Sequence, residues 1–270
     1  METVIVPGRR HSTLREIWAH RELFYFFAWR DFKIRYKQTA IGAGWAIFQP
    51  VLLMVVFTLF FNKVAGISSP SGHYPIFAFT GLLFWNFFGS AMQFASNSLV
   101  GNQAVVTKVY FPRLIAPLSA TLVALIDFVC AVSVYVALML YYRVTPGLIG
   151  IVLVIPMLAI SWIAAAGLGT WLAAVNVKYR DVRQILPFFI QTLMFVTPVI
   201  YALAFVPARF REFVYLNPMA GVITAMRAEL IHQGTVAWSG VAISAGVAVI
   251  LFVLGVFYFE RTESRIADII

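Results

Sequence analysis

Long apolar stretches alternate with short polar segments along most of the chain. Six of these stretches are 19 to 29 residues long, and only one of them contains a charged residue, Asp127. Because a membrane-spanning helix needs about 20 apolar residues, each stretch is long enough to cross a bilayer. We therefore predict an all-α integral membrane fold with six transmembrane helices between residues 41 and 259, located at residues 41–61, 75–94, 114–142, 148–175, 185–203 and 239–259.

The first 40 residues are more polar and form a predicted cytoplasmic arm. Residues 13–16 have the pattern of a capping box, in which Thr13 caps a helix and Glu16 bonds back to it. The helix that follows would place Trp18, Phe24 and Phe27 on a broad apolar side. This pattern favours an amphipathic helix at the membrane interface, and a helix that packs against a soluble partner is the alternative.

Residues 204–238 are fairly apolar but are repeatedly broken by charges and prolines. The uncharged run 213–226 has 14 residues, which is too few to span a membrane. Asn217 followed by Pro218 is typical of a helix start. We predict two short re-entrant helices here, between the fifth and sixth spans, on the extracytoplasmic side.

The amino-acid composition agrees with a membrane protein. Hydrophobic residues make up 61% of the chain and charged residues 11%, whereas a soluble domain has about 25% charged residues. The chain therefore has room for one transmembrane domain, residues 1–270, that ends in a short cytoplasmic tail at 260–270. We predict no separate soluble domain.

The net charge of +9 is explained by membrane topology, because cytoplasmic loops carry an excess of Lys and Arg. With both termini in the cytoplasm, fifteen of the 20 Lys and Arg residues lie inside. The other five lie outside, namely Lys63, Arg143, Arg209, Arg211 and Arg227. This distribution predicts cytoplasmic termini and makes a nucleic-acid partner an unnecessary explanation of the charge.

The sequence offers no constellation for catalysis or metal binding. It lacks the G-x-x-x-x-G-K-[ST] loop that binds ATP phosphates. Its four histidines are scattered without the spacing of metal ligands, and Cys130 is its single cysteine. We expect a transport protein without a catalytic or metal site, and a membrane enzyme that uses loop residues is the alternative.

Asp127 is the one charge deep in an apolar stretch. A carboxylate at the centre of a membrane helix costs roughly 2.5–3.5 kcal/mol on insertion scales. It could therefore be a proton or substrate site, or a structural carboxyl that is neutral or hydrogen-bonded between helices. Because the apolar stretches contain no basic partner, the structural interpretation is favoured.

Two short loops on the predicted cytoplasmic side, residues 108–113 and 176–182, mix aromatic and charged residues. Aromatic and Arg side chains are common anchors of docking surfaces. The same residues would also suit an interfacial aromatic belt with topology-setting charges. Residue types alone leave both interpretations open.

Aromatic residues gather near the start of the second apolar stretch, at Phe84, Trp85, Phe87 and Phe88. Such rings could stack on the faces of sugars along a conduit. They could equally be ordinary packing residues between helices.

In several of these motifs the chain resembles the transmembrane subunit of a type-2 ABC exporter, in the branch that exports lipid-linked polysaccharides such as O antigen, teichoic acid or capsule. The resemblance covers nearly the whole chain, with the motifs in the same order and at the same membrane positions. They are residues 30–37, Ile41-Gly42, Trp45, 108–113, 176–181, 198–201 and 215–219.

The resemblance implies a homodimer in the cell inner membrane that works with two copies of a separate ABC ATPase. That partner would bind ATP and Mg, so no cofactor is expected in this chain. The resemblance implies that this chain meets the ATPase through Lys108, Tyr110, Phe111, Arg113, Lys178, Tyr179, Arg180 and Asp181. It implies an extracytoplasmic gate that includes Asn217, Pro218, Arg227 and Glu229.

It also implies that the lipid head of a glycan enters near the N-terminal helix. Arg30, Lys33, Arg35 and Lys37 could attract a lipid diphosphate there, or could serve topology alone. Two other functions remain open. One is a type-2 exporter of a drug or lipid, and the other is a proton-coupled secondary transporter that uses Asp127, for which the usual inverted repeats are not visible.

Overall fold

The computed structural model describes residues 18–37, 44–64, 66, 73–106, 108 and 111–269, and it contains no β-strand in these ranges. Five helical segments there are long and apolar enough to cross a membrane. The predicted all-α fold is therefore confirmed in the described residues, and five of the predicted spans coincide with candidate membrane-spanning helices. The five segments are α3 with a π-helical continuation (Gly44–Phe57 and Thr58–Val64), α4 (Tyr74–Gly101), α6 with α7 (Ile115–Thr121 and Val123–Tyr142), α8 (Leu148–Lys178) and α12 (Trp238–Ile269).

The predicted fifth span, residues 185–203, is wrong as a continuous spanning helix. The structure has a 15-residue helix, α9 (Val182–Val196), followed by a non-helical segment and a short 3₁₀ turn, Leu203–Phe205. Pro198 explains the break, because the residue before a proline is pushed out of the helical region and Thr197 is extended, with φ −81° and ψ 143°. At 1.5 Å per residue, α9 covers only about 22 Å of a hydrocarbon core of roughly 30 Å.

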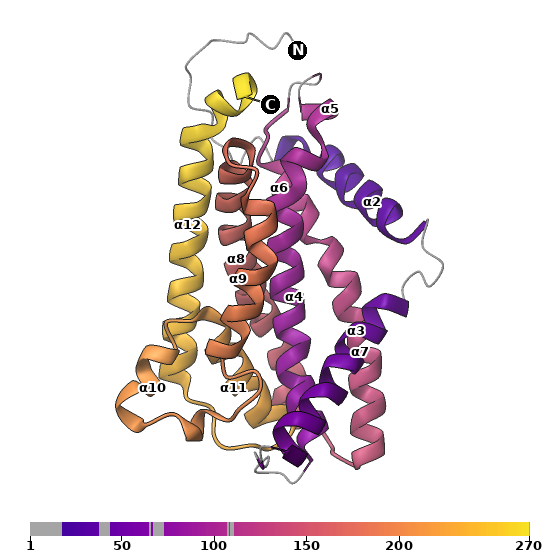
Figure 1. The fold of residues 1–270 in the computed structure, drawn as a ribbon, viewed down its shortest axis with the longest axis vertical. Coiled ribbons are helices and arrows are strands. Elements are labelled where there is room, and N and C mark those ends of the chain that lie inside the picture. The colour runs from indigo at the N-terminus through magenta and orange to yellow at the C-terminus, as the bar shows by residue number, and fades with distance from the viewer. Residues whose placement is uncertain are drawn as a thin grey trace.

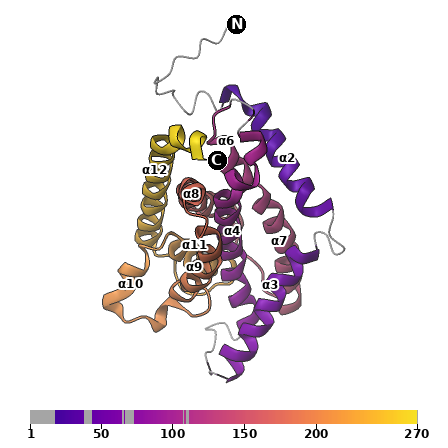
Figure 2. The same ribbon diagram turned by 45° about the horizontal axis from the view of Figure 1, so that its top comes forward.

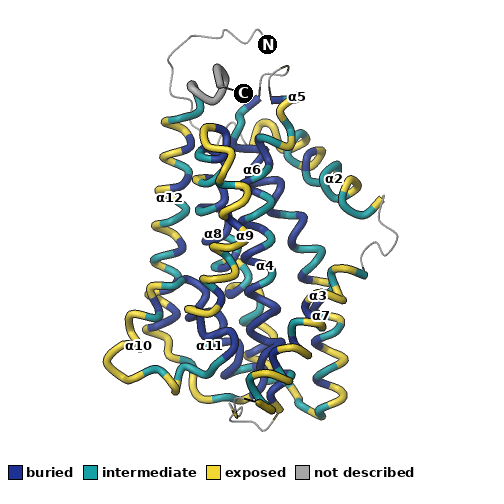
Figure 3. Tube along the Cα trace, viewed as in Figure 1, coloured by how far each residue is buried: buried dark blue, intermediate teal, exposed yellow. Residues whose placement is uncertain are grey.

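Helix α4 is the axis of the bundle. In the most apolar 18-residue stretch of α4, 83% of the residues are buried. In the corresponding stretches of the other four segments only 17–33% are buried. Figure 3 shows this dark central helix among segments whose outer faces are exposed. α4 is also the least hydrophobic of the five segments, which fits a helix surrounded by protein while its neighbours must present aliphatic side chains to lipid.

The two ends of the bundle differ in structure (Figures 1 and 2). At one end, here called the α2 end, lie α5 (Gln103–Val106), the end of α12 and α2 (Arg21–Lys37), which slants along the outer edge of the bundle on the side away from α12. At the opposite end, called the α10 end, lie α10 (Ala208–Val214) and α11 (Pro218–Leu230). Two short helices between the last two apolar stretches were predicted, and their presence is confirmed.

Helix α2 presents large apolar side chains on its outer side. Tyr25, Phe26, Trp29 and Ile34 are exposed, while Phe27 on the inner side is buried against Phe111. Exposed aromatics of this kind fit a helix that lies in a membrane interface. The predicted capping box at residues 13–16 lies outside the described residues.

Helices α8 and α12 cross through glycines. A Cβ atom on Gly255 of α12 would overlap the carbonyl group of Gly167 on α8, and one on Gly167 would overlap the backbone of Phe252. Two residues further along α8, Gly169 packs against Met92 and Ala95 of α4. Close approach of backbones at small residues is a common way for helices to associate in membranes, so α8 is held tightly between α4 and α12.

We predict that Gly255→Leu weakens the α8–α12 crossing by about 1–3 kcal/mol, the usual cost of overpacking. The thermal unfolding midpoint of the purified protein in detergent should fall. Gly246→Leu is the matched control, because Gly246 lies on the same helix with open space at its Cβ position. An unchanged midpoint in Gly255→Leu would show that this crossing is looser than the structure indicates.

Candidate functional site

The four basic residues predicted to meet a lipid head lie on α2, but they point in different directions. Arg30 is turned toward the bundle, where it bonds Asp31 at 2.7 Å. It also donates to the side-chain oxygen of Asn102 at the end of α4, and its guanidinium lies 4.5 Å from the centre of the Phe27 ring. Arg30 is therefore occupied in holding α2 to α4.

Arg35 also points inward, and its partner is Asp127 of α7. Arg35 Nη2 lies 2.8 Å from Asp127 Oδ2, and the Arg35 guanidinium sits 4.4 Å from the centre of the Phe94 ring on α4. The neighbouring Tyr36 hydroxyl donates a hydrogen bond to the other carboxylate oxygen of Asp127. These contacts agree with the favoured interpretation of Asp127 as a structural carboxyl held between helices, and they add a cation that sequence reasoning missed.

Sequence reasoning missed this partner because Arg35 comes from outside the apolar stretches. Arg35 and Asp127 are far apart in sequence, and no spacing rule connects them. The available signal was the cost of a lone carboxylate in a span, which requires a cation from a neighbouring segment. Burial, followed by the hydrogen bond to Asp127, raises the pKa of the Tyr36 hydroxyl, so Tyr36 stays protonated as a donor.

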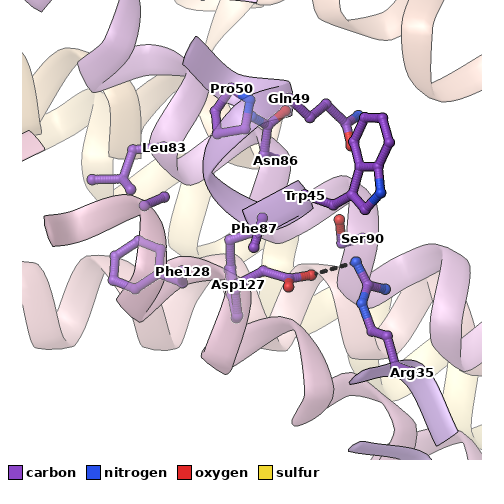
Figure 4. A pocket seen from close by; sticks show the side chains of 12 residues that line it. Arg35, Trp45, Gln49, Pro50, Leu83, Asn86, Phe87, Ser90, Asp127 and Phe128 are labelled. Atoms are coloured by element: carbon purple, nitrogen blue, oxygen red, sulfur yellow. Dashed lines mark ion pairs between the residues drawn. The ribbon is translucent and has the colours of Figure 1, made fainter. Parts of the chain in front are cut away.

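A pocket with a mixed polar and apolar lining opens beside this ion pair, between α3, α4 and α7 (Figure 4). Its lining includes Arg35, Asp127, Gln49, Asn86 and Ser90. The Asn86 side-chain nitrogen is buried there without a hydrogen-bond partner in the described structure. The pocket thus places several polar side chains, among apolar ones, beside the contact between α2 and α7.

Lys33 and Lys37 point away from the bundle and are exposed. Together with Phe26, Trp29, Ile34 and the partly buried Arg30 they line a shallow groove on the outer face of α2. The Lys33 ammonium lies 5.2 Å from the centre of the Trp29 ring. The outer face of α2 therefore combines two available cations with apolar surface, as an interfacial anion site would.

The candidate coupling residues divide into an exposed and an engaged group. Phe111 is buried against Phe27 of α2. Arg113 bonds Glu263 of α12 through its backbone N–H at 3.1 Å and its guanidinium at 2.9 Å. The exposed group comprises Lys108, Lys178, Tyr179, Arg180 and Asp181, and Tyr110 lies outside the described residues.

The turn between α8 and α9 carries most of the exposed group. Tyr179 is 55% exposed, and the Lys178 ammonium lies 4.9 Å from the centre of its ring. Just before the turn, the buried Asn176 donates to the carbonyl of Ser96 on α4 at 2.9 Å. The turn thus projects an aromatic ring and charges from a helix end that is fixed to the central helix.

Asn217 starts helix α11 as predicted. Its side-chain oxygen accepts from the Met219 N–H at 3.0 Å, with Pro218 at the first helical position. Its side-chain nitrogen donates to Thr197 at 2.6 Å, and its carbonyl accepts from the Ser244 hydroxyl at 3.2 Å. Thr197 and Ser244, which sequence reasoning missed, tie this helix start to the end of α9 and to α12.

Arg227 of α11 is buried and binds the backbone that breaks after α9. Its guanidinium donates to the carbonyls of Pro198 at 2.6 Å and Tyr201 at 3.2 Å, and to that of Val199. The guanidinium also donates to the backbone carbonyl of Phe77 on α4 at 3.1 Å, and it lies 3.5 Å from the centre of the Phe77 ring. Arg227 therefore satisfies carbonyls of the non-helical segment after α9 and joins that segment to α4.

Glu229, the last gate candidate, is half-buried, and its carbonyl accepts from the Gly147 N–H at 3.3 Å. A Cβ atom on Gly150 would also clash with the Glu229 backbone. This end of α11 is thus packed against the start of α8. All four gate candidates lie on one firmly held element at the α10 end.

The four aromatics considered as glycan contacts are buried in the core. Phe84, Trp85, Phe87 and Phe88 are 0–3% exposed, and both Phe84 and Phe87 pack against Phe128 of α7. Their burial supports the packing interpretation, because none of them offers a ring face to a sugar in this structure.

We predict that Arg227→Met destabilises the protein by about 2–4 kcal/mol, because several buried carbonyls would lose their donor. The thermal midpoint in detergent should fall well below that of Arg209→Met, which removes an exposed cation from α10. Equal midpoints for the two variants would contradict a stabilising role for Arg227.

Comparison with known proteins agrees with this architecture. Residues 22–231 match the family model described as ABC-2 type transporter. The chain is 29% identical to an O-antigen export system permease protein of Klebsiella pneumoniae, covering 89% of this chain and 92% of that protein. It is 27% identical to one of Myxococcus xanthus (94% and 98%) and 23% identical to the polysialic acid transport protein KpsM of Escherichia coli (88% and 93%). This chain belongs to the ABC-2 type transporter family.

Proposed function

We propose that this chain is the channel-forming subunit of an ATP-driven exporter of lipid-linked polysaccharide, O antigen or a similar polymer. It works as a homodimer in the cell inner membrane with two copies of an ABC ATPase. The ATPase subunits bind ATP and Mg, and this chain carries the polymer from the cytoplasm to the periplasm or cell exterior.

One observation carries the proposal. Three relatives named for O-antigen export or polysialic acid transport align with nearly the whole chain and nearly their own whole length. The alignment therefore includes the membrane bundle, the turn after α8 and the short helices of the α10 end. These parts are the ones that an exporter needs for passage, coupling and gating.

The course of the chain supports six crossings with both termini in the cytoplasm. α9 begins where α8 ends, at the α2 end, and the segment after it leads to α10 at the opposite end (Figure 1). α12 then returns to the α2 end. Exposed basic residues at this end, including Lys108, Lys178, Arg180 and Arg183, are what the positive-inside rule expects of a cytoplasmic face.

The exposed turn after α8 is our proposed contact with the ATPase. It presents Tyr179 and Arg180, residue types that often anchor protein interfaces, on a helix end fixed by Asn176. ATP binding would push this turn and α2, and the two bundles of the dimer would move as rigid bodies. Phe111 and Arg113 would transmit the push to α2 and α12, which they contact.

The outer face of α2 is our proposed site for the lipid head. Of the four cations suggested by the sequence, Lys33 and Lys37 are the two exposed beside apolar side chains. A lipid diphosphate could bind these lysines while its apolar chain stays in the membrane. Arg30 and Arg35 would support the site by holding α2 in place.

The α10 end is our proposed extracytoplasmic gate, with α10 and α11 as re-entrant helices. Arg227 and Asn217 donate hydrogen bonds to the non-helical segment beside α11, as non-helical segments within a membrane require.

Two alternative functions are compatible with parts of this structure. An exporter of a small cargo such as a drug or lipid would use the same fold. A proton-coupled transporter that uses Asp127 is less well supported, because Asp127 is paired with Arg35.

We predict that replacing Tyr179 and Arg180 together by Ala lowers the amount of polymer transported per ATP hydrolysed at least about tenfold. The reason is that the contact with the ATPase would lose one or more anchor residues. Membrane insertion should be normal. The measurement compares ATP hydrolysis and polymer export in vesicles that contain the complex. Arg261→Ala, an exposed cation on α12 at the same end, serves as the control; normal coupling in the Tyr179/Arg180 variant would remove the assignment.

We also predict that Lys33→Gln combined with Lys37→Gln weakens the binding of an anionic lipid-linked glycan to the exporter at the start of transport. Each lysine near a membrane surface contributes about 1 kcal/mol toward an anionic head, so the half-saturating substrate concentration should rise roughly 5-fold per lysine. The maximal rate of transport should stay unchanged. Arg21→Gln, an exposed cation at the start of the same helix, is the control, and an equal rise in it would mean that only total charge matters.

A further inference from the structure

The contact between the end of α2 and the middle of the bundle is polar. Arg35 and Tyr36, in the last turn of α2, both reach Asp127 on α7. Each binds a different carboxylate oxygen of Asp127, and Figure 4 shows the ion pair of Asp127 with Arg35. Arg35 also lies over the Phe94 ring of α4. Arg35 and Tyr36 thereby connect the end of α2 to two spans, α7 through Asp127 and α4 through Phe94.

The rest of α2 is held differently. Near its middle, Phe27 packs against Phe111 and Arg30 bonds Asn102. Toward its end, the outward side chains Ile34 and Lys37 are exposed. Asp127 is thus the polar anchor of the end of α2 that leads toward α3.

An ion pair of this kind selects one position strongly. The Asp127 side chain is 15% exposed and that of Arg35 36%, so Asp127 is largely removed from water. Withdrawing Arg35 would leave a carboxylate inside a span without its cation, which is unfavourable. Apolar packing alone would tolerate sliding of α2, whereas this pair does not.

We propose that Asp127 is a positioning residue that fixes the end of α2 against α4 and α7, so that a displacement of α2 moves these spans with it. The fixed position itself follows from contacts within this chain. Its consequence for transport rests on the proposed export function.

Cys130 provides a natural reporter of this position. It is the only cysteine of the chain and is half-buried. It lies three residues after Asp127, on the same face of α7. If the end of α2 leaves its place, Cys130 becomes more accessible.

The test measures the rate at which N-ethylmaleimide modifies Cys130 in the full-length protein, purified with its ATPase partner. Asp127→Asn and Arg35→Gln should each raise the rate about threefold or more, because each leaves one charge unpaired. The charge swap Arg35→Asp with Asp127→Arg should return the rate toward that of the wild type. Glu22→Gln, which removes an exposed carboxylate from the start of α2, should leave it unchanged.

The proposal is overturned if both single variants label at the wild-type rate, or if the swap labels as fast as they do. Should a charge variant fail to reach the membrane, Tyr36→Phe removes one hydrogen bond and keeps both charges. It must raise the rate by a smaller factor, and an unchanged rate would also overturn the proposal.

Transport per ATP hydrolysed is measured on the same samples. It should fall in the single variants and recover in the swap, because the swap restores the ion pair and with it the position of α2. If the wild-type complex exports no polymer but the labelling follows the expected order, the proposed function fails while the positioning role of Asp127 stands.

Discussion

The structure depends on satisfying polar groups where water is absent. In a membrane, each backbone break and each charge needs a partner from the protein itself. Arg227 meets this need for the chain after α9, where Pro198 ends the helix and carbonyls are left without helical donors. Because this guanidinium satisfies those carbonyls, the α10 end can consist of short helices and turns. The two ends of the bundle therefore differ in structure.

The same constraint shapes the α2 end. Asp127 lies in a span and receives its cation from α2, so a helix at the edge of the bundle is tied to the interior. Arg30 and Arg35 are occupied by these contacts, which leaves Lys33 and Lys37 exposed on the outer face. The loops show the same division between residues that bind other helices and residues that stay exposed. Arg113 binds α12, whereas Tyr179 in the turn after α8 is exposed.

The sequence predicted the features that arise from local patterns. Apolar length predicted five of the spans, and Asn217 with Pro218 predicted the start of α11. The failures have long-range causes. The partner of Asp127 comes from a distant helix, and the fifth span was misjudged because composition alone does not show that Pro198 breaks the helix. The burial of Phe84 and Phe87 depends on α4 being central, which no single segment reveals.

The central claim is that this chain, with an ATPase partner, carries lipid-linked polysaccharide across the membrane. The most direct measurement is reconstitution of the purified complex into vesicles that contain the lipid-linked polymer, followed by enzymatic or lectin detection of polymer on the opposite side. The account predicts translocation that requires ATP, the partner ATPase and the lipid anchor together. Translocation without ATP, or ATP-driven transport of only small lipids or drugs, would contradict it.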